Sequence, residues 1–194
     1  MGFIMRVCVK PKLLIVLCCA LWLTPLSLRA ACCTAQIQQA ELVLENGHYQ
    51  VSAEIDYYLS DKAMEALQNG VPLFWNILIR LQHPRDYLWS EILAEKVIRY
   101  RLQYHALLNV YRVKNETNGE IQNVSTFASA MTLMSSLNNF PLLDVSAALP
   151  DPNVVLAMKV EFDRNALPLP LRPLAYLSKQ WYLSSDWTIW PLKK

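Results

Sequence analysis

The stretch LVLENGHYQVSAEIDY, residues 42–57, decides the fold. Asn46-Gly47 at its centre is the strongest short signal for a β-hairpin, and Leu42 and Leu44 alternate with other residues before it. After the turn, apolar residues alternate with polar ones: Tyr49, Val51, Ala53, Ile55 and Tyr57. Such a period of two is typical of a strand with one buried face and one wet face. The stretch therefore predicts an antiparallel hairpin.

Further strands are predicted along the rest of the chain. Residues 73–81 have apolar side chains at every odd position and stop at His83-Pro84. Residues 87–113 carry the densest alternation, which is interrupted at Ala106-Leu107-Leu108, where we expect a bulge. Residues 154–162 alternate again, and a last strand is expected around Trp187–Trp190.

Two short helices are predicted between the strands. Ser60 is placed to cap one helix, with Asp61 in its first turn, and Gly70 ends it. Ser125 is expected to cap a second helix that ends near Asn138-Asn139. With about seven strands and no βαβ rhythm, the chain is expected to be mainly β (α+β): an antiparallel β-sandwich with two short helical connections.

The first 35 residues have the layout of a secretory signal peptide or membrane anchor. Positive charges at Arg6, Lys10 and Lys12 precede an apolar run from residue 13 to 28, and small residues follow up to Ala35. We therefore expect residues 1–35 to be a signal peptide or membrane anchor, and residues 36–194 to form one β-rich domain outside the cytoplasm.

The fate of this leader stays open on sequence grounds. Leu28-Arg29-Ala30 and Cys33-Thr34-Ala35 both resemble cleavage sites, and the second has small residues at both critical positions. Ala30-Ala31-Cys32 resembles a lipidation site at Cys32, but Arg29 stands where an aliphatic residue is usual. An uncleaved anchor is the third alternative. The domain is accordingly expected in the periplasm, either soluble or tethered to the inner membrane.

Cysteine and charge usage restrict the chemistry of the body. All five cysteines lie in the leader, so the body has no internal disulfide, thiolate metal site or cysteine nucleophile. Four of the 18 Lys and Arg residues are also in the leader, which leaves 14 against 16 acidic residues, a net charge near −2. Nucleic acid is therefore not expected as a partner, because it requires a clear positive surplus.

Two segments of the body resemble a known family. They are ALPLPLRPLAYLSKQWYLSSDWTIWPL, residues 166–192, and YRLQYHAL, residues 100–107. The chain resembles an uncharacterised family of exported proteobacterial proteins, domain of unknown function 4390, from about residue 36 to 192. The resemblance implies a single-domain envelope protein of no assigned activity. It also implies a gene neighbourhood with an rRNA methyltransferase and a sensor histidine kinase of the nitrogen-regulation type, and it carries over no catalytic residues.

No catalytic or cofactor constellation is evident in the sequence. The histidines at 48, 83 and 105 lack ligand spacing, so no metal is expected. A serine-nucleophile elbow and a phosphate-binding loop both need glycines that the body lacks. Glu161 and Asp163 share a strand face, where two carboxylates are typically solvated. We therefore predict no enzyme, no catalytic residue and no cofactor.

The candidate interaction surface combines a polar strand face with the aromatic tail. Arginine guanidinium groups and exposed aromatic side chains often contribute most of the binding energy at protein interfaces. The alternative is that the polar stripe is the solvent face of an ordinary strand and that the aromatic side chains belong to the core. The candidate residues are Arg99, Arg101, Gln103, His105, Arg172, Tyr176, Trp181, Trp187 and Trp190.

Three functions remain open from the residues. The first is a non-enzymatic periplasmic domain that binds an envelope protein and would serve as an accessory to an inner-membrane sensor kinase system. The second is a module that binds a small envelope lipid or glycan in an apolar cavity. The third is a hydrolase or transferase whose site assembles from distant residues around His105. Membrane contact is expected only through the N-terminal segment, and the sequence leaves the oligomeric state open.

Overall fold

The computed structural model describes residues 35–45, 48–85, 90–144 and 153–192. Chain contacts divide the protein into Met1–Ala31 and Cys32–Lys194, and every described residue belongs to the second unit. The predictions for the leader, the Asn46-Gly47 turn and the lipidation site at Cys32 fall outside the described residues.

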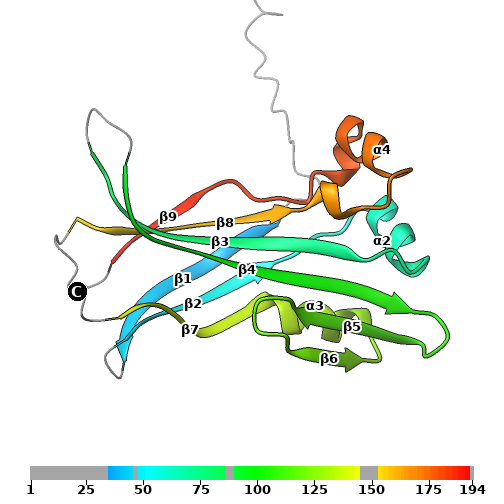
Figure 1. Ribbon diagram of the computed structural model, residues 1–194, viewed down its shortest axis with the longest axis horizontal. Helices are drawn as coiled ribbons and strands as arrows, with labels where there is room; N and C mark the ends of the chain where they lie inside the picture. Colours follow the sequence, from blue (N-terminus) through cyan, green and yellow to red (C-terminus); the bar gives the residue numbers. More distant parts are fainter. Residues whose placement is uncertain (1–34, 46–47, 86–89, 145–152, 193–194) are drawn as a thin grey trace, which may run out of the picture. The chain divides into compact units, whose positions relative to one another are not determined.

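The described strands are antiparallel and form two sheets (Figure 1). The smaller sheet has the order β1-β2-β7, and the larger one has the order β6-β5-β4-β3-β8-β9. Their bounds are β1 Gln36–Glu45, β2 His48–Asp56, β3 Leu73–His83, β4 Glu91–His105, β5 Val110–Asn115, β6 Ile121–Val124, β7 Ser136–Asp144, β8 Val155–Phe162 and β9 Thr188–Pro191. The expected mainly β fold is confirmed.

The hairpin that the sequence predicts is present as β1 and β2. Leu42 lies opposite Val51, and Ala40 lies opposite Ala53. Val51 and Ile55 are fully buried, as the period of two requires, because alternate side chains of a strand point to the same face. The hairpin therefore places one face against the core between the sheets.

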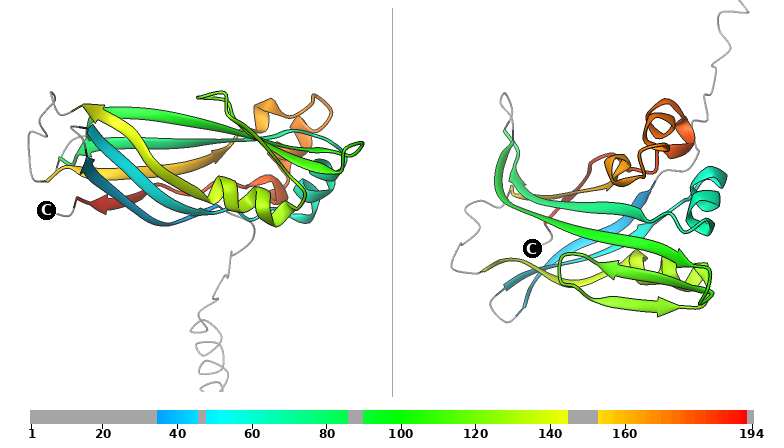
Figure 2. Two further views of the ribbon diagram at one scale, coloured as in Figure 1. Left: turned by 90° about the horizontal axis from the view of Figure 1, so that it is seen from below. Right: turned by 45° about the vertical axis from the view of Figure 1, so that its right-hand side comes forward.

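The core is shared by both sheets. Strand β3 buries all five of its odd-numbered residues from 73 to 81, and β8 buries Leu156, Met158, Val160 and Phe162. The small sheet contributes Ile37, Val51, Ile55, Leu137 and Leu142 to the same cluster. Figure 2 shows β1 and β2 in a different layer from β3 and β4.

The helices are α2 (Asp61–Gln68), α3 (Phe127–Ser135) and α4 (Arg172–Leu177), with 3₁₀ turns at Arg164–Ala166 (η1) and Lys179–Trp181 (η2). Ser60 caps α2 as predicted, since its Oγ accepts from the Ala63 N–H at 3.2 Å. The same Oγ donates to the Gln180 carbonyl at 2.6 Å, and α2 and α4 lie at the same end of the sheets (Figure 1).

Three local predictions are wrong. The interruption at Ala106-Leu107-Leu108 is a turn between β4 and β5, where Asn109 adopts a φ of 50°, and not a bulge. The cap of α3 is Thr126, whose Oγ1 accepts from the Ser129 N–H at 3.1 Å, and not Ser125. Asn138-Asn139 lies inside β7, because α3 already ends at Ser135.

Candidate functional site

The four polar candidates of β4 lie on one face of the larger sheet. Arg99, Arg101, Gln103 and His105 alternate with Ile98 and Leu102, which are fully buried. Side chains of a strand alternate between faces, so the polar set lies on the face opposite the core. The structure gives most of this set a partner within the chain.

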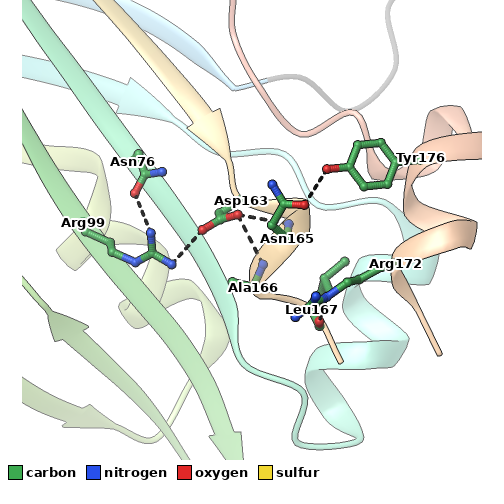
Figure 3. A network of polar contacts seen from close by, with 8 residues as sticks. All are labelled: Asn76, Arg99, Asp163, Asn165, Ala166, Leu167, Arg172 and Tyr176. Atoms are coloured by element: carbon green, nitrogen blue, oxygen red, sulfur yellow. Dashed lines mark hydrogen bonds and ion pairs between the residues drawn. The ribbon is translucent and has the colours of Figure 1, made fainter. Parts of the chain in front are cut away.

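Arg99 is the centre of a polar network that joins β4 to the loop after β8 (Figure 3). Its Nη2 donates to Asp163 Oδ2 at 2.7 Å, and its Nη1 donates to Asn76 Oδ1 at 3.3 Å. The guanidinium carbon also lies 4.8 Å from the centre of the Phe74 ring. The guanidinium of Arg99 therefore links β4 to β3 and to the loop after β8.

Asp163 extends this network toward α4. Its Oδ1 accepts from the backbone N–H groups of Asn165 and Ala166, which caps η1. Asn165 Oδ1 in turn accepts from the Tyr176 hydroxyl at 2.7 Å, and the Arg164 guanidinium lies over the Tyr176 ring at 4.6 Å.

Arg172 lies in the same neighbourhood. Its Nε donates to the Leu167 carbonyl at 2.7 Å (Figure 3). Of the sequence-predicted candidates, the fold therefore brings Arg99, Arg172 and Tyr176 together at one end of the sheets.

A second ion-pair group surrounds Arg101. Arg101 lies directly opposite Lys114 in the β4–β5 ladder, where two like charges repel. Glu116 offsets this repulsion, because its carboxylate contacts Arg101 Nε at 3.0 Å and Lys114 Nζ at 2.6 Å. The hydrogen bond from Lys114 and the charge of Arg101 hold the pKa of Glu116 below its usual value.

Gln103 and His105 lie farther along β4. Gln103 Nε2 donates to the Gly70 carbonyl at 3.3 Å, which ties β4 to the end of α2. His105 Nε2 is buried, and no hydrogen bond joins it to another described residue. None of the described serines or carboxylates is hydrogen-bonded to this nitrogen.

The three candidate tryptophans occupy different environments. Trp181 is only 5 % exposed and stacks on Phe162, with 6.1 Å between ring centres, so its burial excludes it from the exposed surface. Trp187 lies under the Arg80 guanidinium, 4.4 Å from its ring centre. Trp190 is half-buried on β9 and lines the groove described next.

A groove of about 580 Å³ runs between the edge of β1 and the last strand. Six consecutive β1 residues, 39–44, form one wall, and Leu156, Trp190, Pro191 and Leu192 form the other. Because both odd and even residues contribute, the groove follows the strand's edge instead of one of its faces. Among the described strands β1 pairs with β2 alone, so this edge is unpaired.

Sequence reasoning missed this groove. Leu42-Val43-Leu44 is a continuous apolar run, yet a strictly amphipathic strand would place a polar residue at 43. Val43 is 47 % exposed and Leu44 is 55 % exposed. This apolar run was the one sign of the groove in the sequence. It does not show which edge of the strand is open, because that depends on the order of the strands in the sheet.

A smaller pocket of about 380 Å³ lies between β5, β6 and the junction of α3 with β7. Its lining is rich in amide, hydroxyl and carboxylate groups, and includes Tyr100, Asn115, Glu120, Gln122 and Asn138 together with the apolar Leu133, Leu137 and Phe140. Burial and the nearby Glu120 carboxylate raise the pKa of the Tyr100 hydroxyl, which therefore stays protonated and can donate a hydrogen bond.

In the described segments, no group of three or more His, Cys, Asp or Glu side chains is arranged to hold a metal ion. No helix in the described part of the chain combines the length and hydropathy needed to cross a membrane.

Comparison with known proteins returns one finding. A family model described as a domain of unknown function, DUF4390, matches residues 33–191. No curated protein and no solved structure matches the chain.

Proposed function

The chain belongs to the DUF4390 family, and for this member we propose an exported, non-enzymatic domain that binds an extended segment of an envelope protein along the edge of β1. The domain lies in the periplasm, soluble or tethered by its leader, and serves as an accessory to an inner-membrane system such as a sensor kinase. The basic and apolar leader supports export, and the family resemblance suggests the sensor-kinase setting.

The observation that carries this proposal is the open edge of β1 beside the groove. An unpaired strand edge presents backbone N–H and C=O groups that a second extended chain can pair with. Strand addition of this kind takes its affinity from main-chain hydrogen bonds and its specificity from pockets for alternate side chains. The groove supplies such a pocket between Val43, Leu44 and Trp190.

The groove also indicates the chemistry of the bound segment. Its apolar wall favours a segment with an aliphatic or aromatic residue at every second position. Glu41 and Glu45 are exposed on β1 and favour a basic residue nearby. Charges on an edge strand also discourage pairing between two copies of the same edge.

Site-specific photo-crosslinking in the native cell tests this proposal. A photoreactive residue at position 43 of the full chain is expected to trap one envelope protein, whereas the same probe at position 97 is not. Val97 is the matched control, because it is 44 % exposed on a strand of the other sheet.

A paired substitution checks that the edge itself is used. The double substitution Val43→Lys/Leu44→Lys is expected to abolish the crosslink from a probe at position 41, and Ile92→Lys/Val97→Lys is expected to preserve it. Equal crosslinking from positions 43 and 97, or none from 43, would contradict strand addition at β1.

The polar pocket near Tyr100 favours a second candidate function, the binding of a small glycan. Amides, hydroxyls and one carboxylate beside apolar side chains match the hydroxyl groups and apolar faces of a sugar. Titration of the full chain with neutral and N-acetylated oligosaccharides is expected to shift the amide signals of Asn115–Gln122. The substitution Asn138→Leu is expected to remove this shift, and shifts spread evenly over the protein would contradict a site here.

A further inference from the structure

The segment around α4 has an unusual combination of charge and exposure. Residues 164–185 contain three cationic side chains, Arg164, Arg172 and Lys179, and no acidic residue. Five large apolar side chains of this segment are strongly exposed: Leu169 73 %, Leu174 57 %, Tyr176 53 %, Leu177 86 % and Tyr182 48 %. Exposed apolar residues of a soluble domain are normally scattered, so a concentration in one short segment indicates a contact surface.

The local fold keeps this surface outward. Helix α4 packs against the domain through Ala175, which is fully buried. Leu174 and Leu177 are three residues apart and therefore lie on one side of the helix. The bond from Arg172 Nε to the Leu167 carbonyl and that from the Tyr176 hydroxyl to Asn165 fasten α4 to the turn that precedes it (Figure 3).

The point where the chain enters the domain lies beside the same segment. A depression of about 310 Å³ is lined by residues 35–38 together with Tyr182, Ser184, Ser185, Asp186 and Thr188. The 34 residues that precede Ala35 include the apolar leader. Ala35, the first described residue after the leader, therefore lies next to the apolar and cationic segment.

We propose that the α4 surface, residues 164–182, docks on an anionic lipid bilayer. Leucine and tyrosine side chains insert at the headgroup boundary, while arginine and lysine contact the anionic headgroups. The absence of acidic residues between positions 164 and 182 matches a bilayer with anionic headgroups, and Ala35, the first described residue after the leader, lies beside the segment. This membrane contact is additional to the one expected of the leader and goes beyond the proposed function, with which it shares only the location at the envelope.

Amide hydrogen exchange of the full chain in vesicles separates α4 docking from leader insertion. One vesicle contains phosphatidylcholine alone, and the other contains one third phosphatidylglycerol. The leader can insert into both, but α4 gains its cation–headgroup contacts only on the anionic vesicle. Peptides covering residues 167–183 are expected to exchange about fivefold more slowly on the anionic vesicle. This factor corresponds to the binding contribution of one lysine or arginine at an anionic membrane surface.

Two double substitutions complete the test. Leu174→Glu/Leu177→Glu is expected to remove the slowing, and Leu107→Glu/Leu108→Glu, at strongly exposed positions in the β4–β5 turn, is expected to keep it. An unchanged melting temperature verifies that both variants fold. Equal exchange on both vesicles overturns the proposal. Slowing seen only in native membranes, and lost after protease treatment of their surface, overturns it in favour of a protein partner.

These outcomes are independent of the groove. The crosslinking experiment at position 43 reports on β1, and hydrogen exchange of residues 167–183 reports on α4. If crosslinking fails and hydrogen exchange is slowed, strand addition is refuted and membrane docking stands. If crosslinking succeeds and exchange is not slowed, membrane docking is refuted and strand addition stands.

Discussion

Arg99 and Asp163 are 64 positions apart in the chain and form an ion pair with 2.7 Å between Nη2 and Oδ2. Asp163 is the better buried partner, with 17 % of its side chain exposed against 37 % for Arg99. The same carboxylate caps η1, so one side chain joins the larger sheet to the segment that leads into α4.

Removing this carboxylate is expected to weaken the domain. Asp163→Ala loses both the cap and the ion pair, and should lower the free energy of unfolding by about 1–3 kcal/mol. Asp163→Asn keeps a capping oxygen and should cost about half as much. Urea unfolding of the full chain measures both values. Glu161→Ala, which removes an exposed carboxylate two residues earlier on β8, serves as the control and is expected to change the value by less than about 0.5 kcal/mol.

Glu116 makes the stability of the β4–β5 region depend on pH. Its folded-state pKa is lowered, first by the hydrogen bond from Lys114, so the stabilisation is present above the unfolded-state pKa near 4.3 and is lost as the pH falls through the folded value. Glu116→Gln should therefore be less stable than the wild type at pH 7, and the two should converge once the pH has fallen below the folded-state pKa of Glu116. A difference that stays constant from pH 7 to pH 2 would disprove this assignment.

The two tryptophans Trp181 and Trp187 are expected to respond differently to truncation. Trp181→Ala creates a cavity against Phe162 in the core and should lower the free energy of unfolding by about 3–5 kcal/mol. Trp187→Ala removes a 38 % exposed ring and its cation–π contact, which should cost about 1 kcal/mol. Chemical unfolding measures the loss in the free energy of unfolding for each variant. Equal losses would show that the deeper burial of Trp181 does not add to its contribution to stability.

The hydroxyl of Tyr57 is buried without a hydrogen-bond partner among the described residues, and its ring lies edge-on against Trp75 with centres 5.8 Å apart. Burial raises its pKa, so the group stays neutral at all ordinary pH values. Tyr57→Phe is expected to leave stability unchanged or raise it by about 1 kcal/mol, because an unpaired buried polar group carries a desolvation cost. A loss of stability in a thermal melt would reveal a bridging water at this hydroxyl.

Local patterns predicted the strands that carry a clear period of two. β2, β3 and β8 alternate because each buries one face against a common core, and that constraint is written in neighbouring residues. β6 and β7 were missed, since one has only four residues and the other contains Pro141 and the left-handed Asn139. Helix α4 was hidden by the prolines that precede and begin it.

The polar stripe of β4 illustrates how far a candidate site can be read from sequence. Alternation alone placed Arg99, Arg101 and Gln103 on one face. Their partners Asp163, Glu116 and the Gly70 carbonyl could not be inferred, because each pairing depends on which strands and loops become neighbours. The burial of Trp181 could not be inferred for the same reason, because its contact with Phe162 depends on which segments become neighbours.

The sequence by itself determined the strand periodicity, the β1–β2 hairpin, the cysteine-free body and the family. These are properties of adjacent residues, whose spacing alone decides which side chains share a face. Only the tertiary structure decided that β1 is an edge strand, that β9 closes a groove beside it, and that Ala35 meets the α4 segment. These relationships depend on strand order and loop packing. They bring together residues more than a hundred positions apart, and nothing in the sequence near either residue indicates its partner.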